Sequence, residues 1–362
     1  MERATNLNKI LMEAVRVGAS DIHLATGCKP RYRLYGQITN MQYADLTDRD
    51  TQDLLMPLLD AYARAELHSK GQWDLAYNIE GVARFRVNVF FQKGALTGVF
   101  RILSSSVPDY TRLGLPLSVF NLQHKRRGLV LVVGATGSGK STTLASLIDV
   151  INKNMYKNII TFEDPIEYIH WHARSIVNQR EIGTDCMDFK AGLRAALRED
   201  PDVILVGEMR DLETVDIALT AAETGHLVCS TLHTMGVADT VNRILDMYPE
   251  RQQRQVRSIL EGVLEAVVAQ QLLPRKDGNG YVVAYEILYK NREIKKMIRD
   301  GRIDDINEYI KTREAQKDGM CAMDDTIFDL FRKGLVERSV ALDYAFDRKE
   351  MIERTAKLVG GI

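Results

Sequence analysis

The chain has 362 residues, 45% of them hydrophobic and 27% charged, which predicts a globular protein of two or three domains. Its formal net charge of −1 at pH 7 argues against a polyanion-binding surface over the whole chain, and no nucleic-acid partner is expected. The four scattered cysteines form no CxxC pair, so we expect reduced thiols rather than a zinc knuckle or a redox dithiol.

The sequence offers no obvious segment for crossing a membrane. Its longest aliphatic run, LVLVV at 129–133, is far shorter than the roughly 20 residues that span a bilayer. The N-terminal stretch carries charges throughout and lacks the apolar core of a signal peptide. We therefore expect a cytoplasmic protein that reaches a membrane only through its partners.

The first hundred residues have the pattern of a small α+β domain. Apolar residues at near-helical spacing predict a helix at 6–18, and a second helix is expected around 47–66. Five segments predict strands: DIHL, RYRLYGQI, WDLAYNI, ARFRVNVFFQ and LTGVFRIL. We place this domain at 1–103 and interpret SSSVPDYTRLGLP, at 104–116, as a linker because Ser, Pro and Gly break the pattern.

The rest of the chain has the pattern of an α/β protein. From about residue 117 strands and helices alternate, which predicts a parallel sheet with helices on both faces and a core at 117–290. After residue 290 the pattern becomes helical and strongly charged, so a C-terminal helical region is expected at 291–362.

One segment of the core, LVLVVGATGSGKSTT, matches the pattern G-x-x-x-x-G-K-[ST]. An apolar strand pattern precedes it and a helical pattern follows, which is the context of a phosphate-binding loop rather than of a glycine-rich turn. Glycines let backbone N–H groups surround phosphates, the lysine neutralises their charge, and the hydroxyl of Ser141 can bind Mg²⁺. The residues expected to bind ATP are Gly134, Thr136, Gly137, Ser138, Gly139, Lys140, Ser141 and Thr142.

Two apolar segments of the core end in acidic residues. IITFEDPIEY ends its strand pattern at Glu163 and Asp164, and DPDVILVGEMRD places Glu208 after Gly207. Ligands of doubly wound sheets bind at the carboxyl ends of strands, so Glu163 and Glu208 are candidate catalytic residues. Gly207 is interpreted as a small, flexible step that brings Glu208 toward the phosphates. The alternatives are a helix cap for Glu163 or Asp164 and a solvated loop position for Glu208.

A third polar cluster is TAAETGHLVCSTLHT, in which His226 and His233 bracket a strand. With the two acids, these histidines would form a ring of groups that senses the γ-phosphate. The alternative for each histidine is a core position satisfied by backbone groups. Arg210, which follows Glu208, is more typical of a surface or inter-subunit pair than of catalysis.

Four segments, GATGSGKST, TFEDPIEY, DPDVILVGEMRDLET and TAAETGHLVCSTLHT, closely resemble the Walker A, Asp box, Walker B and His box of the type II/IV secretion ATPases. The similarity is greatest to the PilT-like branch, the type IV pilus retraction (twitching motility) ATPases. SDIHLATGCKPRYRLYGQI, RFRVNVFFQ, VPDYTRLGLP and QKDGMCAMDDTIFDLFRKGLV extend it over nearly the full chain. The resemblance implies a PAS-like N-terminal domain, a RecA-like P-loop core, and a homohexamer with nucleotide between its subunits.

The resemblance also implies roles for the polar strand ends. Glu163 would support the attacking water or Mg²⁺, and Glu208 would orient or deprotonate that water. His226 and His233 match His-box residues that link the γ-phosphate to the position of the domain.

Two arginines of the first domain complete the implied site. Arginines of the N-terminal domain reach the nucleotide in this family, and Arg86 and Arg101 are the matching candidates here. The alternative for both is an exposed position on a strand.

Pilus retraction, with an inner-membrane platform protein as partner, is the output that the resemblance implies. EIKKMIRDGR, at 293–302, keeps only the outline of the family's A-I-R-N-L-I-R-E-G-K retraction motif. The longer N-terminal region and four-cysteine insertion of pilus-assembly ATPases do not occur in this sequence, which favours retraction over assembly. The alternatives are a pilus-assembly, secretion or conjugation ATPase of the same superfamily, and a nucleotide-dependent accessory subunit with little hydrolysis.

Overall fold

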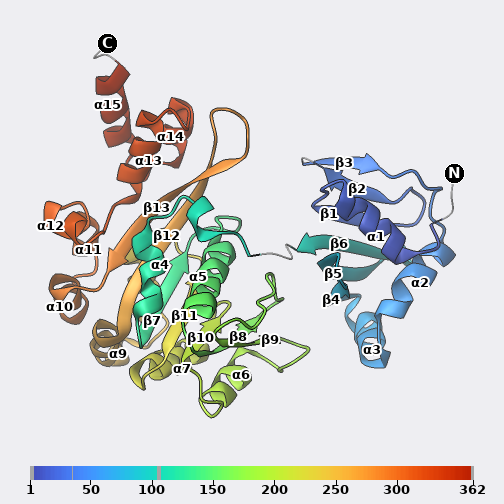
Figure 1. Cartoon of the computed structure of the whole chain (residues 1–362), viewed down its shortest axis with the longest axis horizontal. Coiled ribbons are helices and arrows are strands. Elements are labelled where there is room, and N and C mark those ends of the chain that lie inside the picture. The colour runs from blue at the N-terminus through green and yellow to red at the C-terminus, as the bar shows by residue number, and fades with distance from the viewer. Residues whose placement is uncertain (1–3, 35, 104–106, 360–362) are drawn as a thin grey trace. The chain divides into compact units, whose positions relative to one another are not determined.

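The structure is a computed structural model that describes residues 4–34, 36–103 and 107–359. The chain divides into two compact units, Met1–Ser106 and Val107–Ile362, each with its own sheet and its own hydrophobic core (Figure 1). The fold is therefore mixed α/β with two sheets.

The first unit is a six-stranded antiparallel sheet with the order β3-β2-β1-β6-β5-β4. Its strands are β1 (Asp21–Leu24), β2 (Arg31–Leu34), β3 (Gln37–Asn40), β4 (Gln72–Ile79), β5 (Ala83–Gln92) and β6 (Ala95–Leu103). Its helices are α1 (Leu7–Arg16), α2 (Asp48–Leu55) and α3 (Ala61–Lys70), with a 3-10 turn at Met56–Leu58. The expected helix at 6–18 is confirmed by α1.

The single helix expected around 47–66 is wrong, because the structure has two helices there. Pro57 has no backbone N–H and so cannot donate the next hydrogen bond of an α-helix, and α2 gives way at this point to the 3-10 turn. A new helix then begins after Asp60, whose side chain accepts the N–H of Ala63 at 2.7 Å.

The two faces of the first sheet differ in chemistry. Ile22, Phe100 and Val87 stand opposite one another on β1, β6 and β5, and all three are fully buried in the core of this unit. The neighbouring cross-strand row carries charge instead, and it runs through Arg33, Asp21, Arg101 and Arg86. Side chains alternate between the faces of a sheet, so this charged row lies on the face opposite the core row.

The second unit is built on a seven-stranded sheet with the order β13-β12-β7-β11-β10-β8-β9. All neighbouring strands are parallel except β13, which is antiparallel to β12. The strands are β7 (Gly128–Val133), β8 (Asn158–Glu163), β9 (Ile176–Glu181), β10 (Val203–Val206), β11 (Leu227–Leu232), β12 (Leu264–Pro274) and β13 (Tyr281–Tyr289).

Helices cover both faces of this sheet. Val130 and Val132 of β7 share one core cluster with α4 (Leu117–Phe120) and α5 (Lys140–Asn154), whereas Leu131 belongs to a cluster on the other face. The second cluster packs α6 (Phe189–Ala196), α7 (Leu212–Glu223), α8 (Val237–Asp246) and α9 (Glu250–Val263). The alternation along β7 therefore explains the layered arrangement.

The C-terminal helices are α10 (Arg292–Asp300), α11 (Asp305–Tyr309), α12 (Arg313–Lys317), α13 (Met323–Arg332), α14 (Arg338–Tyr344) and α15 (Arg348–Val359). Ile294 of α10, Ile327 of α13 and Met351 of α15 are buried in the same cluster as Leu131. This region therefore extends the core of the second unit. Over the described part of the chain, no helix combines the length and apolarity needed to cross a membrane.

The segment expected to be a linker is packed over most of its length. Ser146 of α5 donates a hydrogen bond to the Pro108 carbonyl at 2.9 Å, and the rings of Tyr110 and Phe120 lie 4.8 Å apart. Short 3-10 turns occur at Tyr110–Arg112 and Asn121–His124. Residues 107–116 thus pack on the second unit, whereas 104–106 lie outside the described residues.

Candidate active site

The loop between β7 and α5 has a backbone that requires glycine. Gly134 has a φ of +144° and Gly139 a φ of +89°, which are conformations that other residues rarely adopt. A Cβ atom at Gly134 would lie 2.4 Å from the Gln270 carbonyl oxygen and 2.5 Å from Ser138 Oγ. The loop therefore passes so close to β12 that only glycine fits, and it leads directly into the N-terminus of α5, where anions bind favourably.

The side chains of this loop fit a phosphate ligand. Lys140 is buried, and its Nζ donates to the carbonyls of Gly134 at 2.8 Å and Ala135 at 2.9 Å. Burial lowers the pKa of Lys140, and the carboxylates of Glu208 and Glu167 oppose that shift. An anion forms a stronger hydrogen bond with such an ammonium group than a neutral carbonyl does, so a phosphate oxygen can replace these carbonyls as its partner.

The hydroxyl groups of Ser138 and Ser141 also suit a phosphate ligand. Ser138 Oγ is buried and has no hydrogen-bond partner among the described residues, which is unusual for a native hydroxyl and leaves it ready for a ligand oxygen. Ser141 is exposed at the second position of α5, whereas the hydroxyl of Thr142 lies 2.9 Å from that of Tyr168. Thr136 and Gly137 are exposed in the loop.

Glu208 lies just beyond the end of β10 with both carboxylate oxygens engaged. Arg210 Nε donates to Oε2 at 2.8 Å, and His233 Nε2 lies 3.1 Å from Oε1. The Glu208 side chain is only 17% exposed, whereas Arg210 is 69% exposed. The solvated-loop alternative for Glu208 therefore does not describe its environment, and the structure brings Glu208 and His233 together.

Gly207 was expected to be a flexible step toward the phosphates, but its structural role is a close contact with β8. Its φ is not positive, so no unusual backbone freedom is used there. Its N–H donates to the Phe162 carbonyl at 2.8 Å, and a Cβ atom would lie 3.1 Å from that same oxygen. The glycine lets β10 approach β8 closely, which places Glu208 beside the end of that strand.

Glu163 is the last residue of β8. Its Oε1 accepts hydrogen bonds from Thr161 Oγ1 at 2.6 Å and from Gln179 Nε2 at 3.0 Å. Burial raises the pKa of this carboxyl group, against the opposing effect of those two donors. It caps no helix in the structure, so the alternative of a helix cap is excluded for Glu163.

The two histidines lie at opposite ends of β11. His233 follows the last residue of the strand, whereas His226 precedes the first, and its backbone carbonyl accepts the N–H of Gly128 at 3.0 Å. His226 Nδ1 lies 2.9 Å from the Ala221 carbonyl oxygen at the end of α7. The expectation that both histidines line the phosphate site is therefore corrected, because the structure places His226 at the start of β7 and away from its phosphate loop.

Arg86 and Arg101 belong to the first unit. They are directly opposite each other on β5 and β6, and their side chains are 48% and 66% exposed. Arg101 Nε donates to Asp21 Oδ1 at 3.0 Å, and Arg86 Nε lies 3.9 Å from Asp74 Oδ1. Two like charges at a cross-strand pair repel unless anions lie nearby, and these two aspartates supply them.

Sequence reasoning missed several polar groups around the site. Gln270 of β12 is 3% exposed, its carbonyl contacts the phosphate loop, and its Oε1 has no partner among the described residues. A glutamine within the apolar run VVAQQLL was the available signal. Tyr168, Thr161 and Gln179 had no comparable signal, because only the folded structure brings them to Thr142 and Glu163.

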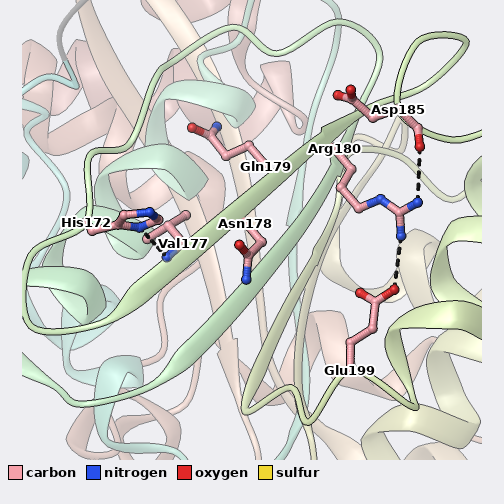
Figure 2. Close-up of a pocket in the computed structure, with 7 residues that line it drawn as sticks. All are labelled: His172, Val177, Asn178, Gln179, Arg180, Asp185 and Glu199. Atoms are coloured by element: carbon pink, nitrogen blue, oxygen red, sulfur yellow. Dashed lines mark hydrogen bonds and ion pairs between the residues drawn. The ribbon is translucent and has the colours of Figure 1, made fainter.

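A shallow pocket of about 590 Å³ lies along the edge strand β9, and no predicted site residue lines it (Figure 2). Arg180 is held there between the Asp185 carbonyl oxygen and the Glu199 carboxylate, both at 3.1 Å. Gln179 connects the pocket to Glu163 through the hydrogen bond described above. The described residues hold no cluster of three or more His, Cys, Asp or Glu side chains that suits a metal ion.

Comparison with known proteins agrees with this geometry. The family model described as "Type II/IV secretion system protein" matches residues 2–315. The chain is 40% identical over 340 residues to the "Type IV pilus retractation ATPase PilT" of Pseudomonas aeruginosa, covering 94% of this chain and 98% of that protein. It is 41% identical over 324 residues to a "Twitching motility protein" of Neisseria gonorrhoeae, covering 90% and 86%.

A solved structure is also similar to this chain over nearly its full length. The chain superposes on the "Pilus Retraction Motor PilT and Bound ADP" with a TM-score of 0.89 and 46% identity, over 94% of this chain and 97% of that one. The phosphate loop, the acidic strand ends and these full-length similarities lead to one conclusion: the chain belongs to the type II/IV secretion system protein family.

Proposed function

We propose that this protein is an ATPase that powers retraction of a type IV pilus, and hence twitching motility. The observation that carries the proposal is the convergence of Lys140, Glu208 and His233 at the carboxyl ends of three neighbouring strands. Full-length similarity to proteins named as retraction ATPases supports retraction over the other outputs of the family.

The phosphoryl chemistry depends on positioning and charge. The backbone N–H groups of the loop and the Lys140 ammonium bind the phosphates, and Glu208 orients the attacking water and accepts its proton. His233 holds the Glu208 carboxylate through its ring nitrogen. Ser141 and Glu163 would hold Mg²⁺, which supplies positive charge on the phosphate oxygens when it is bound.

The proposal includes an architecture. The domain at 1–103 is PAS-like, the core at 117–290 is RecA-like with residues 107–116 packed on it, and a helical region follows at 291–362. Six copies would form a ring in which Arg86 and Arg101 supply positive charge to ATP. The ring would work at the cytoplasmic face of the inner membrane on a platform protein of the pilus.

Phosphate release by purified protein tests the chemistry. We expect Glu208→Gln to bind nucleotide normally but to hydrolyse ATP at least ~100-fold more slowly, the usual scale of a lost general base. Glu213→Gln is the matched control, because Glu213 pairs with Lys190 and Arg194 on the surface of α7. A wild-type protein without phosphate release would instead identify an accessory subunit.

The phenotype of a deletion strain tests whether the protein powers pilus retraction. Loss of twitching with surface pili retained is the expected phenotype, and Glu213→Gln should restore movement whereas Glu208→Gln should not. A strain without pili would point to assembly, and normal twitching would remove retraction from consideration.

A further inference from the structure

Two helices of the second unit begin without a side-chain cap of their own. α8 begins at Val237 after Gly236, α13 begins at Met323 after Ala322, and neither preceding residue provides a side-chain hydrogen bond. Val237 and Met323 are fully buried, so water cannot satisfy the free N–H groups at these helix ends. The acceptors have to come from another element.

Glu286 of β13 supplies the acceptors for both helices. Its Oε1 accepts the N–H of Val237 at 2.7 Å, and its Oε2 accepts the N–H of Met323 at 3.3 Å. The residue is only 4% exposed, and burial raises the pKa of its carboxyl group, as do the nearby Asp239 and Asp324. A carboxylate in such a place is costly unless donors compensate, and two helix N-termini are suitable donors.

The first of these helices follows directly from the candidate active site. His233 lies 3.1 Å from Glu208, and α8 begins four residues later at Val237. The intervening loop is held to the first turn of α8 by a 2.7 Å hydrogen bond between the hydroxyls of Thr234 and Thr240. A displacement of His233 therefore also moves the N–H group of Val237, which donates to Glu286.

The second helix is held to β13 on either side of Glu286. The backbones of Ile287 and Cys321 exchange hydrogen bonds of 3.0 and 3.2 Å. Thr326 Oγ1 donates to the Tyr285 carbonyl at 2.8 Å and accepts the Tyr285 N–H at 3.1 Å. The start of α13 is thus fixed to the strand that carries Glu286.

We infer that Glu286 is a positioning residue that couples the loop carrying His233 to the C-terminal helical region through its two carboxylate oxygens. The inference rests on the proposed function, in which the nucleotide binds at the site that contains Glu208 and His233. The N–H groups at the two helix ends donate to the same carboxylate. Movement of that loop on nucleotide binding therefore changes how well ordered the first turn of α13 is.

Hydrogen exchange of the full chain, with and without Mg²⁺ and a non-hydrolysable ATP analogue, tests this coupling. In the wild type the analogue should slow exchange at the first turns of both α8 and α13. In Glu286→Gln the α13 response should fall at least threefold, while analogue affinity stays within threefold, because an amide offers one acceptor oxygen instead of two. An unchanged α13 response in Glu286→Gln, or none in the wild type, would overturn the inference.

Two further variants complete the design. Glu265→Gln alters a buried glutamate on the neighbouring strand β12 that binds Lys125 and Lys290, and both responses should persist. Gly236→Ala places a Cβ atom in close contact, 3.3 Å from Asp239 Oδ2 and 3.4 Å from Glu286 Oε1, and leaves both Glu286 oxygens free to accept, so both responses should persist there as well. If Glu208→Gln hydrolyses ATP normally while Glu286→Gln loses the response, the proposed chemistry fails and the coupling stands.

Discussion

At Glu163, burial and function favour opposite protonation states. Binding Mg²⁺ or orienting water requires a carboxylate, whereas burial raises the pKa and favours the neutral acid. Two donors, Thr161 and Gln179, reduce that effect without removing it. This conflict is typical of functional sites, where stability is lower than the fold alone would allow.

The conflict makes the stability of the protein depend on pH. Because folding raises the pKa of Glu163 above its ordinary value of 4.5, the stabilisation from its bound proton is present below that value and is lost as pH rises through the folded pKa. Glu163→Gln is neutral at every pH and keeps an oxygen for both donors. We expect it to be more stable than the wild type in urea at pH 8, with a smaller difference at pH 5, and to hydrolyse ATP poorly.

Glu213→Gln provides a control of opposite sign for this prediction. The hydrogen bond from Lys190 lowers the pKa of Glu213, so its ionised form is the one that folding favours. The variant should gain no stability at pH 8. Equal behaviour of the two variants across this pH range would contradict the assignment of a raised pKa to Glu163.

At the scale of elements, the phosphate loop depends on its contact with β12. Gly134→Ala would combine a strained φ of +144° with a Cβ atom 2.4 Å from the Gln270 carbonyl. We expect about 2–4 kcal/mol less stability, from backbone strain and overpacking together, and a loss of ADP binding of at least ~10-fold. Urea unfolding and titration with a fluorescent ADP analogue measure the two effects.

Gly183→Ala separates strain from contact. Gly183 has a φ of +82°, but a Cβ atom there would meet nothing within 4 Å. Strain alone should cost about 1–2 kcal/mol and leave ADP binding unchanged. If both alanine variants lose the same stability and Gly134→Ala still binds ADP normally, the close contact with β12 does not shape the loop.

The elements differ in how well the sequence predicts them. β7 and α5 were predictable because an apolar run, a glycine loop and a helical period occur in succession at 129–154. β9 was not, because IVNQRE forms an edge strand with only Val177 and Glu181 fully buried and therefore lacks a strand pattern. Likewise, His226 and His233 look equivalent in sequence, and only the direction of β11 separates them.

At the scale of the whole molecule, the family resemblance predicted from four short segments is confirmed by a family match over residues 2–315 and by full-length relatives. How copies of this chain contact one another is harder to predict from the sequence. Whether Arg86 and Arg101 serve the phosphate site of their own chain or that of another copy depends on contacts that one chain's sequence pattern does not encode.

Mixed rings distinguish these possibilities. Lys140→Ala removes the phosphate site, and the double variant Arg86→Ala/Arg101→Ala removes the arginines, so each protein alone should hydrolyse ATP poorly. In a random 1:1 mixture of co-refolded chains, about one quarter of the sites would join an intact loop to intact arginines from a neighbour. Activity should therefore rise well above that of either parent.

The negative control for recovery mixes Lys140→Ala with Glu208→Gln, which damage the same site. No arrangement of these chains produces an intact site, so their mixture should stay inactive whether or not the arginines act between chains. If the arginine mixture only averages its two parents, the arginines act within their own chain or play no part in hydrolysis. Recovery in the first mixture alone would show that one chain's arginines complete another chain's catalytic site, because no other pairing of the two defects restores hydrolysis.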